Sequence, residues 1–295
     1  MAQHPPELQA EDQAPSTGSA GRPSNGTSAV HRLARALPLP AGAGMARMLV
    51  ERNYRSFRRT WTIIVSGFFE PVFFLFSMGV GIGALVGDVD AGDGRLVPYA
   101  VFVAPALLAA SAMNGAVFDS TTNVFFKLKY ARLYDSVLST PLGPRDVAVG
   151  EITWALLRGL VYSGAFLLVA ALAGAVTSPA ALLAVPAASL IGWAFASVGM
   201  ALTTFMRTWA DFDYVNLAIL PMFLFSATFY PLDTSPPALQ WVVQATPLYH
   251  GVAMVRDLML GQVGPGIWVH VAYLVTMGLV GTVWTARRIE RLLLR

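Results

Sequence analysis

The sequence predicts an all-α membrane protein with six transmembrane helices, an N-terminal amphipathic interfacial helix, and re-entrant half-helices between spans five and six. Three observations predict this class. The chain is 55% apolar and only 13% charged, about half the charged fraction of an ordinary soluble domain. Its apolar residues form long blocks, and a block of about 18 residues can cross a bilayer. Its basic residues gather between those blocks, as in cytoplasmic loops.

The first 40 residues differ in composition from the rest of the chain. They are rich in Pro, Gly, Ser, Ala and Gln and show no apolar periodicity. Such a segment cannot bury enough surface to offset its chain entropy. We therefore predict a disordered cytoplasmic tail over residues 1–40 and a six-helix transmembrane domain over residues 41–295.

Residues 45–60 predict the interfacial helix. Val50, Tyr54 and Phe57 fall at helical spacing, and arginines crowd the same turns. This pattern is typical of an amphipathic helix at a membrane surface, with its arginines among the phosphate headgroups. A solvated basic linker is the alternative interpretation.

Six apolar blocks then predict the membrane spans. The fifth block is short and Pro221 interrupts it, so the sequence defines its geometry least well. The predicted spans cover residues 61–86, 97–118, 152–176, 180–206, 214–230 and 266–286.

The distribution of Lys and Arg predicts the orientation of these spans. Seventeen of the twenty basic residues lie on one side, before the first span, in the even-numbered connections and after the sixth span. The other side holds only Arg95 and Arg256, while Arg158 falls inside the third span. Because cytoplasmic loops are the basic ones, we expect both termini in the cytoplasm and a multi-pass protein of the plasma membrane.

Several chemistries have no support in the sequence. A phosphate-binding loop needs G-x-x-x-x-G-K-[ST], but the only lysines are Lys127 and Lys129, and neither follows that pattern. There is no cysteine, and the four histidines form no H-E-x-x-H pair. We therefore expect no catalytic, metal or cofactor site and no nucleic-acid partner. If ATP drives the process, another polypeptide must be the ATPase.

The first span contains a polar point and a row of glycines. Glu70 and Pro71 lie about ten residues into it, where a carboxylate costs a few kcal/mol and faces a partner or a water-filled cavity. Two interpretations stay open: a polar point on a transport route or subunit interface, or a carboxylate that only fixes a kink. Gly79, Gly83 and Gly87 follow at four-residue spacing, which indicates a surface for close helix packing.

The connection between spans two and three contains a second amphipathic helix. Leu133, Tyr134, Val137 and Leu138 supply its apolar residues, and Pro141 ends it. A short helix of this kind can dock into a groove of a partner protein. A helix resting on the lipid headgroups is the alternative.

The segment after the fifth span is too apolar for an exposed loop and too rich in proline for a simple span. Half-helices in the outer leaflet fit it best, packed by protein where their backbone groups need partners. Its marker residues are Pro231, Asp233, Pro247, His250 and Arg256.

Two of these motifs resemble those of a known family. The run E-P-x-x-x-L-F-x-x-G-x-G-x-G from Glu70 to Gly83 resembles the first span of ABC-2 type transporter permeases. F-Y-P-L-D, T-P-L-Y-H and V-R-D-L-M-L-G within residues 225–261 resemble the hallmark segment of one subgroup. That subgroup includes the nodulation lipo-oligosaccharide exporter and daunorubicin-type efflux permeases. Gly150 and Glu151, which open span three, fit as well, and the resemblance covers about residues 45–295.

The resemblance implies a permease subunit that pairs with a second permease copy and with separate ABC-type ATPase subunits, which bind the ATP. It places a coupling helix within residues 127–142 and implies export of an amphiphile such as a glycolipid, a lipo-oligosaccharide or a lipophilic drug. Two other classes stay open from the residues alone. One is a lipid-modifying membrane enzyme, for which only Asp211 and Asp213 lie near a span end. The other is a passive channel or scaffold.

Overall fold

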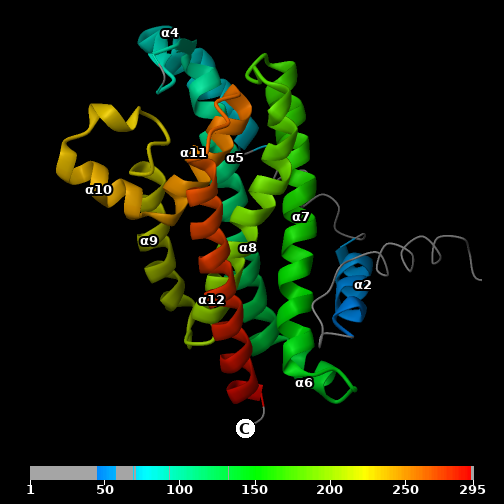
Figure 1. Cartoon of the computed structure of the whole chain (residues 1–295). Coiled ribbons are helices and arrows are strands. Elements are labelled where there is room, and N and C mark those ends of the chain that lie inside the picture. Colours follow the sequence, from blue (N-terminus) through cyan, green and yellow to red (C-terminus); the bar gives the residue numbers. More distant parts are fainter. Residues whose placement is uncertain (1–44, 58–68, 70, 93, 132, 294–295) are drawn as a thin grey trace, which may run out of the picture.

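The chain forms an elongated helical bundle in a computed structural model that describes residues 45–57, 69, 71–92, 94–131 and 133–293. Figure 1 shows α6 and the end of α12 at one end of the bundle and α4 at the other. We call these the α6 end and the α4 end. The helices run between the two ends, and α2 lies beside α7.

Helices dominate the described part of the chain, and one short hairpin interrupts them. The hairpin pairs β1 with β2 in antiparallel register, Val89 opposite Val97. The elements are, in chain order, α2 (Ala46–Phe57), η1 (Ser77–Ile82), α4 (Gly83–Val86), β1 (Asp88–Asp90), β2 (Leu96–Pro98), α5 (Tyr99–Phe118), η2 (Asp119–Asn123), η3 (Phe126–Tyr130), α6 (Leu133–Leu138), α7 (Pro144–Leu172), η4 (Pro179–Leu183), α8 (Ala184–Thr203), η5 (Trp209–Asp211), α9 (Phe212–Leu224), η6 (Leu232–Thr234), α10 (Pro237–Ala245), α11 (Pro247–Leu260) and α12 (Ile267–Leu293).

The core lies around α8, which contacts α5, α7, α11 and α12. Small residues let these helices approach closely. Glycine has no Cβ atom, and one added to Gly281 of α12 would lie only 2.9 Å from the Cβ of Ser197. Hydroxyl groups connect the same two helices. Thr285 donates to the backbone carbonyl of Ser197 at 2.8 Å, and the Ser197 and Thr282 hydroxyls lie 3.1 Å apart. Close packing and interhelical hydrogen bonds are what hold helices together in lipid, where apolar contact alone gives little preference.

Four of the six predicted spans are long and apolar enough to cross a membrane. They are the helical stretches Tyr99–Tyr130, Arg145–Leu172, Pro179–Thr203 and Ile267–Arg291, which match predicted spans two, three, four and six. The prediction of a mostly helical membrane protein is confirmed. For the first span, residues 61–68 and Glu70 lie outside the described residues, and the described part is the apolar helix Pro71–Val86.

The predicted fifth span, residues 214–230, is too long. Helix α9 has 13 residues, or about 20 Å, whereas the hydrocarbon core of a bilayer is about 30 Å thick. The helix ends where the Phe225 N–H donates to the Pro221 carbonyl at 2.8 Å. Ala227 then adopts a positive φ of 53°, which no helix continues through.

The second span continues further than its apolar block. The helix runs from Tyr99 through Tyr130, twelve residues past the predicted end at 118, and includes the π-helical turns η2 and η3. The apolar pattern breaks at Asp119, but the helix does not, because Arg158 of α7 pairs with that carboxylate. π-Helical turns often occur at functional sites.

The amphipathic helix predicted near the N-terminus is α2. Leu49 is buried against α7, and a Cβ atom on Gly150 would lie 2.9 Å from its Cδ2 atom. Arg47, Arg52 and Arg55 are exposed on the outer side. The glycine therefore allows α2 to lie directly against the first turns of α7.

Candidate functional site

The predicted coupling helix is α6, a short helix at the α6 end of the bundle (Figure 1). Its apolar residues face the chain itself. Tyr134 is 2% exposed and Val137 is 8% exposed, and both pack in a cluster with residues of α2, α7, α8 and α12. Leu133 is partly buried against the same cluster, and the side chain of Leu138 lies outside the described part.

The outer side of α6 is polar. Ser136, Ser139 and Thr140 are exposed, and the Ser139 hydroxyl donates to the Ser136 carbonyl at 2.7 Å. The helix is thus anchored to the bundle by its apolar residues and presents a polar surface away from it. A partner that contacts α6 without rearranging it would meet this polar surface.

A buried carboxylate connects α6's neighbours. Glu151 of α7 accepts from Lys127 of η3 at 2.7 Å and from Asn53 of α2 at 3.2 Å, both at its Oε2 atom. Burial, followed by the negative charge of Glu151, raises the pKa of Tyr134 well above its ordinary value. Tyr134 is therefore a neutral phenol at physiological pH. The arrangement ties α2, α7 and the segment before α6 into one unit.

A second ion pair lies deeper in the bundle. Asp119 of η2 pairs with Arg158 of α7, and both side chains are largely buried. Charged residues inside a membrane domain are costly and usually pair with each other. Sequence reasoning placed Arg158 inside a span but did not find its partner. The sequence signal for this pair was a carboxylate, Asp119, at the end of one apolar block and an arginine, Arg158, inside the next.

The predicted residues of the first span have different surroundings. Glu70 lies outside the described residues, and Pro71, at the start of the helix Pro71–Val86, is buried. A Cβ atom on Gly79 would lie 2.9 Å from that of Ala100, so this glycine allows close contact with α5. At Gly83 the corresponding contact, with Tyr99, is an ordinary 3.8 Å. Gly87 ends the helix at a φ of 73° and has open space around it.

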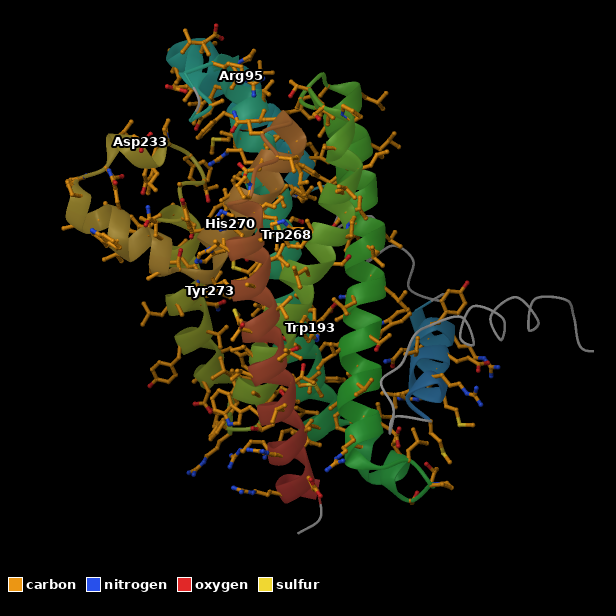
Figure 2. All side chains as sticks on the ribbon, viewed as in Figure 1. Arg95, Trp193, Asp233, Trp268, His270 and Tyr273 are labelled. Carbon is orange, nitrogen blue, oxygen red and sulfur yellow. The ribbon has the colours of Figure 1, made fainter. Side chains whose placement is uncertain are left out.

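The segment after α9 forms two helices, α10 and α11, nearer to the α4 end (Figure 1). Pro231 precedes η6, which contains the exposed Asp233, and Pro247 is the first residue of α11. Figure 2 shows Asp233 to the side of the bundle. In contrast, α11 is inside the core, where Leu248 and Val255 are fully buried.

Arg256 holds this outer segment against α5. Its guanidinium donates to the Ala227 carbonyl at 2.9 Å and lies 4.1 Å above the ring centre of Phe102. One turn earlier in α5, the Tyr99 hydroxyl donates to the Phe229 carbonyl at 3.2 Å. These contacts supply partners for the irregular backbone after α9, as such backbone requires inside a membrane domain.

His250 and His270 meet where α11 and α12 adjoin. Their Nδ1 atoms lie 2.8 Å apart, and the ring of Tyr273 stacks on His250 at 4.0 Å. The Tyr273 hydroxyl also donates to the Ala245 carbonyl at the end of α10, at 3.0 Å. Figure 2 places His270 and Tyr273 on the side of α12 toward α10. Within the described residues, no group of three His, Asp or Glu side chains could hold a metal ion.

The four long apolar helices, with an ion pair buried between two of them, define a multi-pass membrane protein. Comparison with known proteins agrees. The family pattern of ABC-2 type transporters matches residues 46–260, and the chain belongs to that family.

Curated relatives cover most of the chain. It is 33% identical over 259 residues to Nodulation protein J of Rhizobium leguminosarum bv. viciae, covering 86% of this chain and 98% of the relative. It is also 33% identical over 238 residues to Nodulation protein J of Sinorhizobium fredii (strain NBRC 101917 / NGR234), covering 80% of this chain and 89% of the relative. The chain is thus a membrane permease of the ABC-2 type, similar over nearly its whole helical domain to these proteins.

Proposed function

We propose that the chain is the permease subunit of an exporter of amphiphiles in the plasma membrane, energised by a separate ABC-type ATPase that docks at the α6 end. The observation that carries this proposal is α6 itself, a helix whose Tyr134 and Val137 side chains are buried in the bundle while its polar side faces outward. An ATPase that pushes on such a helix moves the bundle with it.

The α6 end is the cytoplasmic end in this proposal. Basic residues support this orientation, because cytoplasmic ends of membrane proteins carry an excess of Lys and Arg. Arg95, in contrast, lies toward the α4 end (Figure 2). With α12 ending at the α6 end, the C-terminus is cytoplasmic. The basic residues of η3, the start of α7, the connection before α9 and the end of α12 are Lys127, Lys129, Arg145, Arg207, Arg287, Arg288 and Arg291.

The ATPase partner binds the nucleotide, and the permease binds none. The sequence supports this division of work, because neither of its two lysines belongs to a phosphate-binding loop.

A second permease copy completes the transport path. Large apolar side chains such as Phe73 of the helix Pro71–Val86 and Leu217 of α9 are exposed on the single chain. Lipid, a second copy and the apolar part of an amphiphile are suitable neighbours for them.

We expect Ser136→Arg to separate docking from folding. The side chain of Ser136 is exposed, so arginine fits without entering the core, but its bulk and charge obstruct a partner that binds the polar side of α6. Co-purification of the ATPase should fall about tenfold and export should fall with it, while thermal stability stays unchanged. The matched control is Val263→Arg, at an exposed position between α11 and α12, away from the α6 end.

If the Ser136→Arg permease still recruits the ATPase and exports normally, α6 is not the docking element. The helix would then rest on the lipid headgroups, and the connection that holds Arg207 and Asp211 would become the next candidate.

A further inference from the structure

An aromatic cluster joins the segment before α6 to the base of α9. The indole of Trp209 stacks on the ring of Tyr130, with centres 5.6 Å apart and planes 27° apart. It also meets the ring of Phe125 edge-on at 5.3 Å and lies 5.4 Å from that of Phe212. Phe125 is 1% exposed and lies edge-on to Phe212, with centres 5.1 Å apart. Because Phe125 and Tyr130 lie in or beside η3, and Trp209 and Phe212 in η5 and α9, the cluster links two parts of the chain distant in sequence.

The connection that carries Trp209 is a rigid turn. Asp211 accepts from the backbone N–H groups of Arg207 at 2.6 Å and Thr208 at 3.1 Å, and from the Thr208 hydroxyl at 3.3 Å. These two backbone N–H groups lower the pKa of Asp211, which is therefore ionised at neutral pH. The turn fixes the start of α9 to the end of α8 and sets Trp209 in a defined place.

The first residue of helix α9 is buried, whereas the rest of the helix is only partly buried or exposed. Phe212 is its one buried residue. Further along, Val215, Ile219, Met222 and Phe223 are partly buried against the core, whereas Leu217 and Leu220 are exposed. A helix that is fully buried only at its first residue can tilt about that contact at lower cost than a helix buried along its length.

Residues 125–130, which contact the base of α9, also lead into α6. Tyr130 ends η3, and α6 begins at Leu133. Lys127, in the same η3 turn, is tied to Glu151 of α7. A displacement of α6 that carries the adjoining Tyr130 with it is passed by the stacked rings to Trp209 and α9. At its other end α9 continues into the outer segment that holds α10 and α11.

We propose that Trp209 is a positioning residue that transmits movement of α6 to α9, so that α9 and the outer segment respond to the state of the ATPase. This inference rests on the proposed function, because it takes α6 as the docking element. Trp209 touches no substrate in this account. It acts through the stack with Tyr130 and the contact with Phe212.

The test uses the permease–ATPase complex in lipid nanodiscs. The chain has no cysteine, so Leu220→Cys on α9 and Leu279→Cys on α12, both exposed positions, give one pair of spin labels per permease copy. Assembly of the labelled permease with an excess of the unlabelled, cysteine-free chain keeps one pair of labels in each complex. The distance between the labels is measured without nucleotide and with a non-hydrolysable ATP analogue. The variant is Trp209→Leu, which keeps an apolar side chain but removes the stacking.

In the parent complex we expect the label distance to change on nucleotide binding. In Trp209→Leu we expect that change to disappear and export to fall about tenfold, while ATPase co-purification and basal ATP hydrolysis stay within about twofold. Trp209→Phe, which can still stack, should restore both the distance change and export. Trp268→Leu, at an exposed tryptophan on α12 nearer the α4 end, is the matched control and should change neither (Figure 2).

The inference is overturned if Trp209→Leu keeps both the distance change and export, which would make Trp209 only an anchor at the membrane interface. It is also overturned if the parent complex binds the ATPase and exports substrate without any distance change at α9. Failure of the parent permease to bind an ATPase at all is a different result, and contradicts the proposed function itself.

Discussion

Arg158→Ala is expected to destabilise the folded permease by about 3–5 kcal/mol, because it leaves the buried Asp119 carboxyl without its partner inside the bundle. The side chains of Asp119 and Arg158 are 6% and 14% exposed, so water cannot replace the lost interaction. Thermal unfolding of the purified permease in nanodiscs measures the loss. The double variant Asp119→Asn with Arg158→Gln removes both charges and should recover most of the stability.

Arg145→Ala is the matched control for this experiment. Arg145 lies 3.9 Å from Glu290, but its side chain is 72% exposed, and such pairs contribute little. Its loss should be difficult to detect in the same unfolding assay. If Arg158→Ala and Arg145→Ala unfold alike, the buried ion pair does not hold η2 against α7.

Tyr134→Asp is expected to remove both the fold of the α6 region and transport. The new carboxylate would lie in an apolar cluster beside Glu151, at an expected cost of about 4 kcal/mol. Thermal stability, ATPase recruitment and export should therefore all decrease together. This pattern differs from that of Ser136→Arg, for which stability is expected to stay unchanged.

Tyr134→Phe is the control for this second prediction. Within the described residues the buried Tyr134 hydroxyl forms no regular hydrogen bond and lies in the field of the Glu151 carboxylate, so its removal should change stability little. A Tyr134→Asp permease that is as stable as the parent would contradict the burial of this side chain. A Tyr134→Phe permease that loses recruitment would show that the hydroxyl, rather than the ring, makes the important contact.

The sequence predicts the membrane class and four of the spans well, because long apolar blocks report directly on transfer into lipid. It predicts the ends of spans poorly where a polar residue is satisfied from another helix. Asp119 breaks an apolar block, yet its helix continues to Tyr130 because Arg158 neutralises the carboxylate. The fifth span fails for the opposite reason. Its block is apolar through Tyr230, but the backbone leaves the helix before Ala227, where φ is positive.

The candidate site shows a similar limit. The sequence locates an amphipathic helix at residues 133–138, but periodicity alone cannot say what covers its apolar side. In the structure α2, α7, α8 and α12 cover Tyr134 and Val137. The aromatic cluster around Trp209 was likewise hidden, because its members come from segments about eighty residues apart and no local spacing relates them. Tertiary contacts of this kind are outside the reach of a single sequence.

The most direct test of the central proposal replaces Ser136 by a photo-reactive amino acid in the intact complex. Irradiation should cross-link the permease to the ATPase from this position on the outer side of α6. The same residue at Val263, an exposed position between α11 and α12, should give no ATPase cross-link. Strong cross-linking from Val263, or none from Ser136 in a complex that exports its substrate, would contradict docking at the α6 end.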